Sequence, residues 1–208
     1  MIVSTSIPLH KMLIGKRLLI FDFDGTLVDT SPLHEAAFNS VLEPWGLKVD
    51  YTAIAGFRTI DAFLAIFAAN GLSVSKLKLQ ELTLSKQMTV RGLIERGLEP
   101  MSGVDKFLRW ARPRYRLALY SSGSSGTVKI ALQKLNYSGW FDPLLCSEDV
   151  SNAKPHPEGF LKVISISKVS ADQAIIFEDS DAGVLGAHQA NVDCIRVSAK
   201  TFEDFAPF

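Results

Sequence analysis

The sequence has 208 residues, enough for one hydrophobic core or for a core with a small appended domain. Lys plus Arg and Asp plus Glu number 22 each, so no overall charge favours nucleic acid or an anionic membrane as a partner. No segment approaches the roughly 18 consecutive apolar residues of a membrane span, and the N-terminal segment lacks the pattern of a secretory leader. We therefore expect a cytoplasmic protein with no nucleic-acid or membrane partner, a monomer by default, with a dimer left open.

Short apolar segments, taken in chain order, alternate with helical patterns. The predicted strands are Arg17–Asp22, Tyr115–Ser121, Pro143–Cys146, Ala174–Glu178 and Cys194–Val197. The helical patterns among them are Val104–Ala111, Gly126–Leu135 and Pro157–Ser167. Strands with little polar alternation are typical of a parallel sheet that is covered on both faces. The order therefore predicts an α/β fold with a doubly wound, Rossmann-like parallel sheet.

The region from about Pro32 to Glu99 contains helical patterns and no convincing strand. Its connections to the rest of the chain are expected near Thr30–Pro32 and Pro100–Gly103, where Pro and Gly interrupt the periodicity. We interpret residues 32–99 as an inserted all-helical cap domain, and residues 1–31 and 100–208 as the α/β core. Because such lids lie over the ligand site, the cap is expected to set specificity.

Polar side chains follow several predicted strands. Because ligands bind beyond the carboxyl ends of parallel strands, these side chains are expected to share one cleft. They are Asp22, Asp24, Ser121, Lys154, Glu178 and Asp179. Several carboxylates in one cleft would repel one another and require a cation, and Mg²⁺ suits oxygen ligands. With Lys154 and the backbone N–H groups of the SSGSSG segment, such a cleft would receive a phosphoryl group.

These segments resemble the four motifs of the haloacid dehalogenase-like hydrolase superfamily, in the branch of phosphatases and β-phosphoglucomutase-like enzymes with a helical cap. The first motif, DxDGT[LV], stands as DFDGTL from Asp22 to Leu27. Ser121 follows as the second, Lys154 within AKPHPEGF as the third, and Glu178-Asp179 within FEDSDAG as the fourth.

The resemblance implies a role for each matching residue. Asp22 would be the nucleophile, and Asp24 would protonate the leaving oxygen and later activate water. Asp22, the Asp24 backbone carbonyl and Asp179 would ligate Mg²⁺, with Glu178 as a ligand or acting through water. Ser121 and Lys154 would bind phosphoryl oxygens, and Lys154 would also restrain the nucleophile. Gly25 and Thr26 would turn the chain beside the phosphate. Ser122, Gly123 and Ser124 are alternatives to Ser121 for the closest contact with the phosphate.

Four cap residues and one core residue carry weaker predictions. The resemblance places His34 facing the active site, but a partly exposed helix histidine is an equal interpretation. Arg58 resembles a substrate-contacting arginine of the mutases, although the usual Gly-x-x-Arg spacing is shortened here between Gly56 and Arg58. For Lys86 and Arg91 we favour a solvated helix face over contact with a second anionic group. Asp181 is expected to begin a helix.

The function predicted from these motifs is a Mg²⁺-dependent phosphatase that hydrolyses a small phosphomonoester, such as a sugar phosphate, through an aspartyl-phosphate on Asp22. The alternative is a β-phosphoglucomutase-like phosphomutase that uses the same intermediate, which the altered Gly56/Arg58 spacing disfavours. Asp24 argues against a dehalogenase, which needs no proton donor for an oxygen leaving group. A catalytically silent binding protein is disfavoured because no motif residue is missing.

Overall fold

A five-stranded parallel sheet forms the centre of the protein. The computed structural model describes residues 9–203 and 205. The expectation that the N-terminal segment is no secretory leader concerns residues 1–8 in part, and these lie outside the described residues. The strand order is β3-β2-β1-β4-β5, as predicted for a doubly wound sheet. The strands are β1 (Leu18–Phe21), β2 (Arg116–Tyr120), β3 (Leu144–Leu145), β4 (Ala174–Glu178) and β5 (Asp193–Arg196). Each observed strand lies within two residues of its predicted bounds, and the fold class is confirmed.

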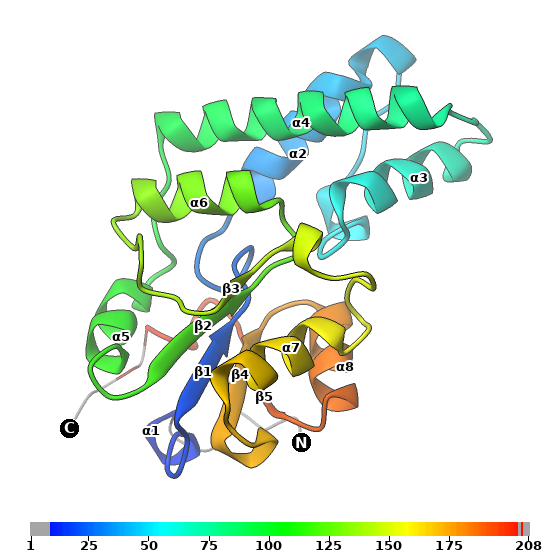
Figure 1. The fold of residues 1–208 in the computed structure, drawn as a ribbon. Helices are drawn as coiled ribbons and strands as arrows, with labels where there is room; N and C mark the ends of the chain where they lie inside the picture. The colour runs from blue at the N-terminus through cyan, green and yellow to red at the C-terminus, as the bar shows by residue number, and fades with distance from the viewer. Residues whose placement is uncertain (1–8, 204, 206–208) are drawn as a thin grey trace.

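Helices cover both faces of this sheet (Figure 1). Their bounds are α1 (Leu9–Met12), α2 (Ser31–Leu42), α3 (Thr59–Ala69), α4 (Lys76–Arg96), α5 (Val104–Ala111), α6 (Ser125–Lys134), α7 (Glu158–Ser167) and α8 (Asp181–Gln189). Short 3₁₀ helices are η1 (Glu43–Trp45), η2 (Tyr51–Ala53), η3 (Ser147–Asp149) and η4 (Ala171–Gln173). The predicted helices over α5, α6 and α7 are confirmed to within a residue at each end.

Alternation along the strands divides the core into two clusters. Successive strand residues point to opposite faces, so Leu19 and Phe21 of β1 pack with α5 and α6, whereas Leu18 and Ile20 pack with α7 and α8. The C-terminal segment joins the first cluster through Phe202, whose ring lies 5.0 Å from that of Phe107 in α5. Both cysteines, Cys146 and Cys194, are free and buried.

The helices between β1 and α5 form a third cluster above the carboxyl ends of the strands (Figure 1). It joins α2, α3 and the first half of α4, where Leu79 and Leu82 are buried. Farther along the same helix, Val90 and Ile94 belong to the core cluster instead. Helix α4 therefore spans both hydrophobic clusters, and the domain bounds at residues 31/32 and 99/100 stay a prediction.

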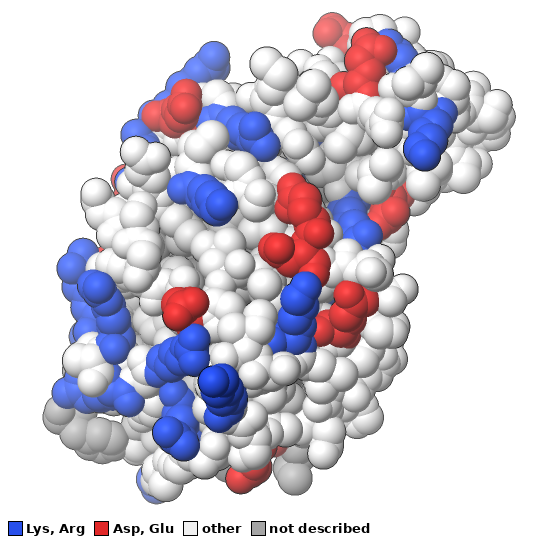
Figure 2. All heavy atoms as spheres, viewed as in Figure 1, with Lys and Arg blue, Asp and Glu red and all other residues white. Residues whose placement is uncertain are grey.

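Acidic and basic side chains mix over the face seen in Figure 2, with a gathering of basic ones near α5 and the start of β2. Two arginines of these elements form ion pairs with nearby aspartates. Arg109 pairs with Asp105, and Arg116 pairs with Asp142. Within the described residues, no helix combines the length and the apolar character needed to cross a membrane.

Candidate active site

The loop after β1 carries the first two aspartates. The backbone N–H of Asp22 donates to the Phe177 carbonyl at 2.9 Å, which continues the pairing with β4 and places a carboxylate at the end of a buried strand. Gly25 then turns with φ +84°, and any side chain there would overlap the Asp179 carboxylate. Thr26 donates from Oγ1 to Asp179 Oδ1 at 3.3 Å. The Gly-Thr pair thus brings this loop against the residue that follows β4.

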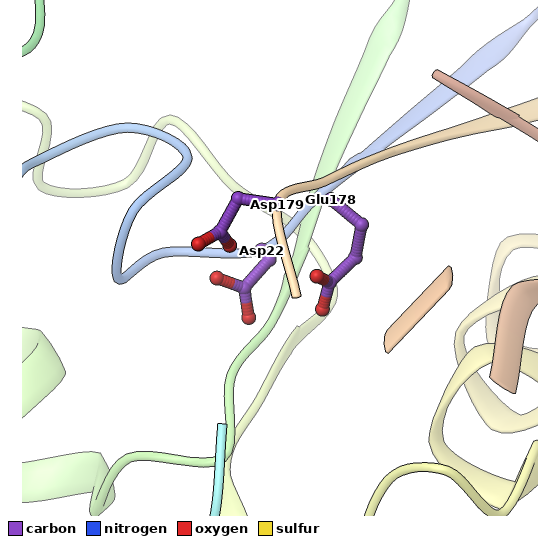
Figure 3. A group of neighbouring side chains, drawn as sticks. All are labelled: Asp22, Glu178 and Asp179. Carbon is purple, nitrogen blue, oxygen red and sulfur yellow. The ribbon is translucent and has the colours of Figure 1, made fainter. Parts of the chain in front are cut away.

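Three carboxylates converge where β1 and β4 end, as Figure 3 shows: Asp22, Glu178 and Asp179. One oxygen of each lies within 4.8 Å of the others. Burial raises the pKa of Asp22 well above its ordinary value; Lys154 opposes this rise, and the Glu178 and Asp179 charges add to it. Burial and the Glu178 charge raise the pKa of Asp179 to about 6. Carboxylates that repel one another in this way are stabilised by a hard divalent cation with oxygen ligands, such as Mg²⁺.

Lys154 is enclosed beside these carboxylates, with a side chain that is 1% exposed. Its Nζ lies 2.5 Å from Asp22 Oδ1 and also contacts Glu178 Oε1. The two carboxylates more than offset the effect of burial and raise the pKa of this lysine, which is therefore charged at neutral pH. The lysine fixes the orientation of Asp22.

Glu178 is fully buried, and both its oxygens already have partners. Oε1 contacts Lys154, while Oε2 accepts from the backbone N–H and the hydroxyl of Ser180, at 2.9 and 3.0 Å. The Ser180 hydroxyl in turn caps α8 by accepting from the Gly183 N–H at 3.0 Å. These bonds favour a Glu178 that acts on a metal through water.

Gly183 lies against that carboxylate, so a matched pair of glycine substitutions tests the packing. A Cβ at Gly183 would overlap the Glu178 side chain, whereas a Cβ at Gly92 in α4 meets nothing within 4 Å. We expect Gly183→Ala to lower the free energy of unfolding by about 3 kcal/mol. Gly92→Ala should raise it by about 0.5–1 kcal/mol, because alanine favours helix. Urea denaturation measures both, and equal effects would contradict the packing.

Asp24 is not one of the three carboxylates that lie within 4.8 Å of one another, but it lines the same cavity as Asp22 and Asp179. Its Oδ1 accepts from Thr30 Oγ1 at 2.5 Å and lies 3.3 Å from His34 Nε2. Burial alone would raise the pKa of Asp24, but the nearby His34 imidazole and the hydrogen bond from the Thr30 hydroxyl outweigh it and lower the pKa to about 2. These two partners draw the carboxylate toward the cap.

His34 is buried against Asp24, which matches the active-site interpretation rather than the exposed one. Its Nδ1 lies 2.5 Å from Lys86 Nζ. The prediction of a solvated Lys86 is wrong: only 2% of this residue is exposed, and Nζ lies 4.5 Å above the Phe38 ring. The cause is the packing of α4 on α2, which covers the apolar stem of the lysine. Burial lowers the pKa of Lys86 to about 8.

Neither cap arginine is among the residues that line the central cavity. Arg91 is half-buried, not on a solvated face as predicted, because its Nε donates to Thr127 Oγ1 at 3.2 Å across the contact between α4 and α6. Arg58 is the N-cap residue directly before α3, and its Nη2 donates to the Val150 carbonyl at 3.0 Å. Arg58 does not line the central cavity. Its predicted contact with substrate stays a prediction.

Asp181 is the first residue of α8, as expected.

The segment after β2 presents its second serine, rather than its first, to the cavity. Ser121 is fully buried, and its Oγ accepts from the Gly123 N–H at 2.9 Å. Ser122 and Gly123 line the cavity. The Ser122 hydroxyl is buried and has no hydrogen-bond partner among the described residues. An unpaired hydroxyl at this edge suits a phosphoryl oxygen. Ser121 Oγ accepts one hydrogen bond and keeps its own proton to donate, so its predicted phosphate contact stays a prediction.

A cavity of about 40 Å³ lies between the core carboxylates and the cap. It has room for about three water molecules. Sequence reasoning missed several cap residues that line it: Phe38, Tyr51, Phe57 and Thr59. Their sequence context gives no signal, because only the packing of α2, α3 and η2 brings them over the strand ends.

Known proteins match this chain over most of its length. A family model described as haloacid dehalogenase-like hydrolase matches residues 19–197. Fructose-1-phosphate phosphatase YqaB of Escherichia coli strain K12 is 30% identical over 179 residues, which cover 86% of this chain and 95% of that protein. A phosphorylated carbohydrates phosphatase of Thermotoga maritima is 28% identical over 181 residues, or 85% and 82% of the two chains.

A solved structure shares the fold. The β-phosphoglucomutase of Clostridium difficile superposes with a TM-score of 0.81 and 24% identity, and covers 88% of this chain and 85% of its own. Together with the family match, this likeness confirms the predicted α/β core with a helical cap, and the named phosphatase relatives confirm the predicted enzyme class. The chain belongs to the haloacid dehalogenase-like hydrolase family.

Proposed function

We propose that this protein is a Mg²⁺-dependent phosphatase that hydrolyses a small phosphomonoester through an aspartyl-phosphate on Asp22. One observation carries the proposal: the Asp22 carboxylate lies at the end of β1 between the Lys154 ammonium, 2.5 Å away, and the Glu178 and Asp179 carboxylates. This is the arrangement that a nucleophile needs beside a metal and a phosphoryl group. The sugar phosphatase names of the relatives support it.

Mg²⁺ would be held by Asp22, Asp179 and the Asp24 backbone carbonyl, with Glu178 through water, and would supply positive charge to the phosphoryl oxygens. Lys154 provides a second positive charge on the same side. The Ser121 hydroxyl, which accepts from the Gly123 N–H and keeps its own proton to donate, and the buried Ser122 hydroxyl are the candidates for the remaining phosphoryl oxygens. The same polar groups would neutralise charge that develops during transfer.

The first step is attack of an Asp22 carboxylate oxygen on phosphorus. The bond from phosphorus to the leaving oxygen breaks, and that oxygen takes a proton from Asp24. Because the free Asp24 has a pKa of about 2, it must gain this proton when the negatively charged phosphoryl group arrives and raises its pKa. Water then attacks phosphorus, gives its proton back to Asp24, and releases phosphate and the Asp22 carboxylate.

A β-phosphoglucomutase-like reaction is the alternative. It is disfavoured because no arginine of the cap lines the described part of the cavity. A mutase must hold a bisphosphate, which requires a cation for the second phosphate. In the Gly-x-x-Arg pattern that starts at Gly56, Thr59 stands where the arginine would be, and Thr59 lines the cavity. Arg58 donates to the Val150 carbonyl and does not line the cavity. The likeness to a solved mutase, at 24% identity, supports the fold alone.

An assay with p-nitrophenyl phosphate and small phosphomonoesters tests this proposal. We expect phosphate release with Mg²⁺ and loss of it, to below a few per cent, when a chelator removes the metal, because the carboxylates alone repel the phosphoryl group. Readdition of Mg²⁺ should restore the rate. Glucose 1-phosphate isomerisation, followed in parallel, would favour the mutase, and turnover that persists in chelator would contradict the metal requirement.

A further inference from the structure

We propose that Tyr51 is a specificity-determining residue, whose hydroxyl donates a hydrogen bond to a hydroxyl of the leaving group. The cap thereby selects monophosphates of small, uncharged, hydroxylated compounds and rejects substrates with a second anionic group. This inference rests on the proposed phosphatase function and adds the substrate class to it.

Tyr51 is held over the carboxylates by its neighbours. It begins η2, which Asp50 caps by accepting from the Thr52 N–H and hydroxyl at 2.9 and 2.7 Å. The Tyr51 N–H donates to Glu35 Oε2 at 3.1 Å, and the ring stacks on His34 with centroids 5.4 Å apart. A ring fixed at both its backbone and its face loses little freedom when it binds a ligand.

The Tyr51 hydroxyl is left without a protein partner. Tyr51 lines the cavity with Asp22, Asp24 and Asp179, and within the described residues its hydroxyl makes no hydrogen bond. Burial raises the pKa of this phenol, and the three carboxylates raise it further, so the hydroxyl stays protonated. A protonated donor that faces the cavity and lacks a partner suits a hydroxyl or ether oxygen of the substrate.

The described lining of the cavity also carries more carboxylates than basic side chains. Among the described residues that line it, the basic ones are His34 and Lys86. Lys86 Nζ lies 2.5 Å from His34 Nδ1, and His34 Nε2 lies 3.3 Å from Asp24 Oδ1. The Lys86 ammonium thus faces the three carboxylates of Asp22, Asp24 and Asp179 in the described lining. The nearby carboxylates would repel an added negative charge, which must be paired when it is buried. An uncharged leaving group meets no such penalty beside Phe38 and Thr59.

Steady-state kinetics with three probes tests the inference: fructose 1-phosphate, fructose 1,6-bisphosphate and phenyl phosphate, whose leaving group carries no further hydroxyl. We expect the wild type to prefer the monophosphate over the bisphosphate by at least about tenfold in kcat/KM. In Tyr51→Phe, the ratio of kcat/KM for fructose 1-phosphate to that for phenyl phosphate should fall about tenfold, mainly through KM, because one hydrogen bond is lost. Tyr115→Phe, far from the cavity, is the matched control and should keep the ratio.

A gain of charge supplies the converse test. Thr59→Arg places a cation in the lining, and we expect it to raise the ratio of bisphosphate to monophosphate turnover about tenfold. An unchanged ratio in Tyr51→Phe, or equal wild-type use of the bisphosphate, would overturn the inference while phenyl phosphate hydrolysis still upholds the phosphatase. Absence of turnover with all three probes would overturn both.

Discussion

The Asp22→Asn variant is expected to lose roughly 10⁴-fold or more of kcat/KM with every phosphomonoester, because an amide cannot serve as the nucleophile. The substitution keeps the shape of the side chain, and Lys154 keeps its contact with Glu178. The fold should therefore persist, and a melting temperature within a few degrees of the wild type separates lost chemistry from unfolding. Steady-state kinetics with p-nitrophenyl phosphate measures the loss.

Asp29→Asn is the matched control for this variant. Asp29 lies in the same loop, is exposed, and accepts from the Ser31 N–H at 3.2 Å without lining the cavity. We expect its kcat/KM to stay within about threefold of the wild type. Unchanged turnover in Asp22→Asn would remove the nucleophile from the proposed mechanism.

The Lys154→Met variant is expected to lose both activity and stability. Removal of the ammonium leaves the buried Asp22 and Glu178 carboxylates without their shared cation. Breaking a buried ion pair in this way costs about 3–5 kcal/mol of the free energy of unfolding. Urea denaturation measures that cost, and kcat/KM should fall about 10²-fold or more, since the phosphoryl group and the nucleophile both lose a positive partner.

Two further variants show whether charge causes the Lys154 effect. Lys162→Met removes an exposed lysine of α7 that bonds to the Asp149 carbonyl, and should cost less than about 1 kcal/mol. Lys154→Met combined with Glu178→Gln removes one of the two stranded charges, and should recover about 1 kcal/mol or more relative to Lys154→Met. A double variant that is less stable than the single one would contradict the electrostatic explanation.

The sheet could be predicted from the sequence because each strand is a local signal. Segments such as Leu18–Phe21 and residues 174–177 are apolar and buried on both faces, as a covered parallel strand requires. The carboxyl ends of these strands meet at one edge, so the sequence positions of Asp22 and Asp179 already imply their proximity. The bounds of the strands and of α5, α6 and α7 follow from the same local patterns, whereas the strand order depends on pairing between segments far apart in the chain.

The cap side of the site could not be predicted, because it depends on how helices pack. Lys86 lies in a helix with a polar sequence, and only the contact of α4 with α2 buries it against His34. Tyr51 reaches the carboxylates through a 3₁₀ turn that no apolar periodicity marks. The separation of Asp24 from the metal cluster likewise depends on Thr30 and His34, which are partners supplied by the start of α2.

A trapped phosphoenzyme tests the central claim most directly. Wild-type protein turning over a phosphomonoester with Mg²⁺ is quenched in acid, digested and analysed by mass spectrometry. The proposed mechanism predicts one phosphoryl group on the peptide that contains Asp22, localised to that residue and absent from Asp22→Asn treated in the same way. Full turnover with no phosphoryl group on Asp22, or with the group on another residue, would contradict it.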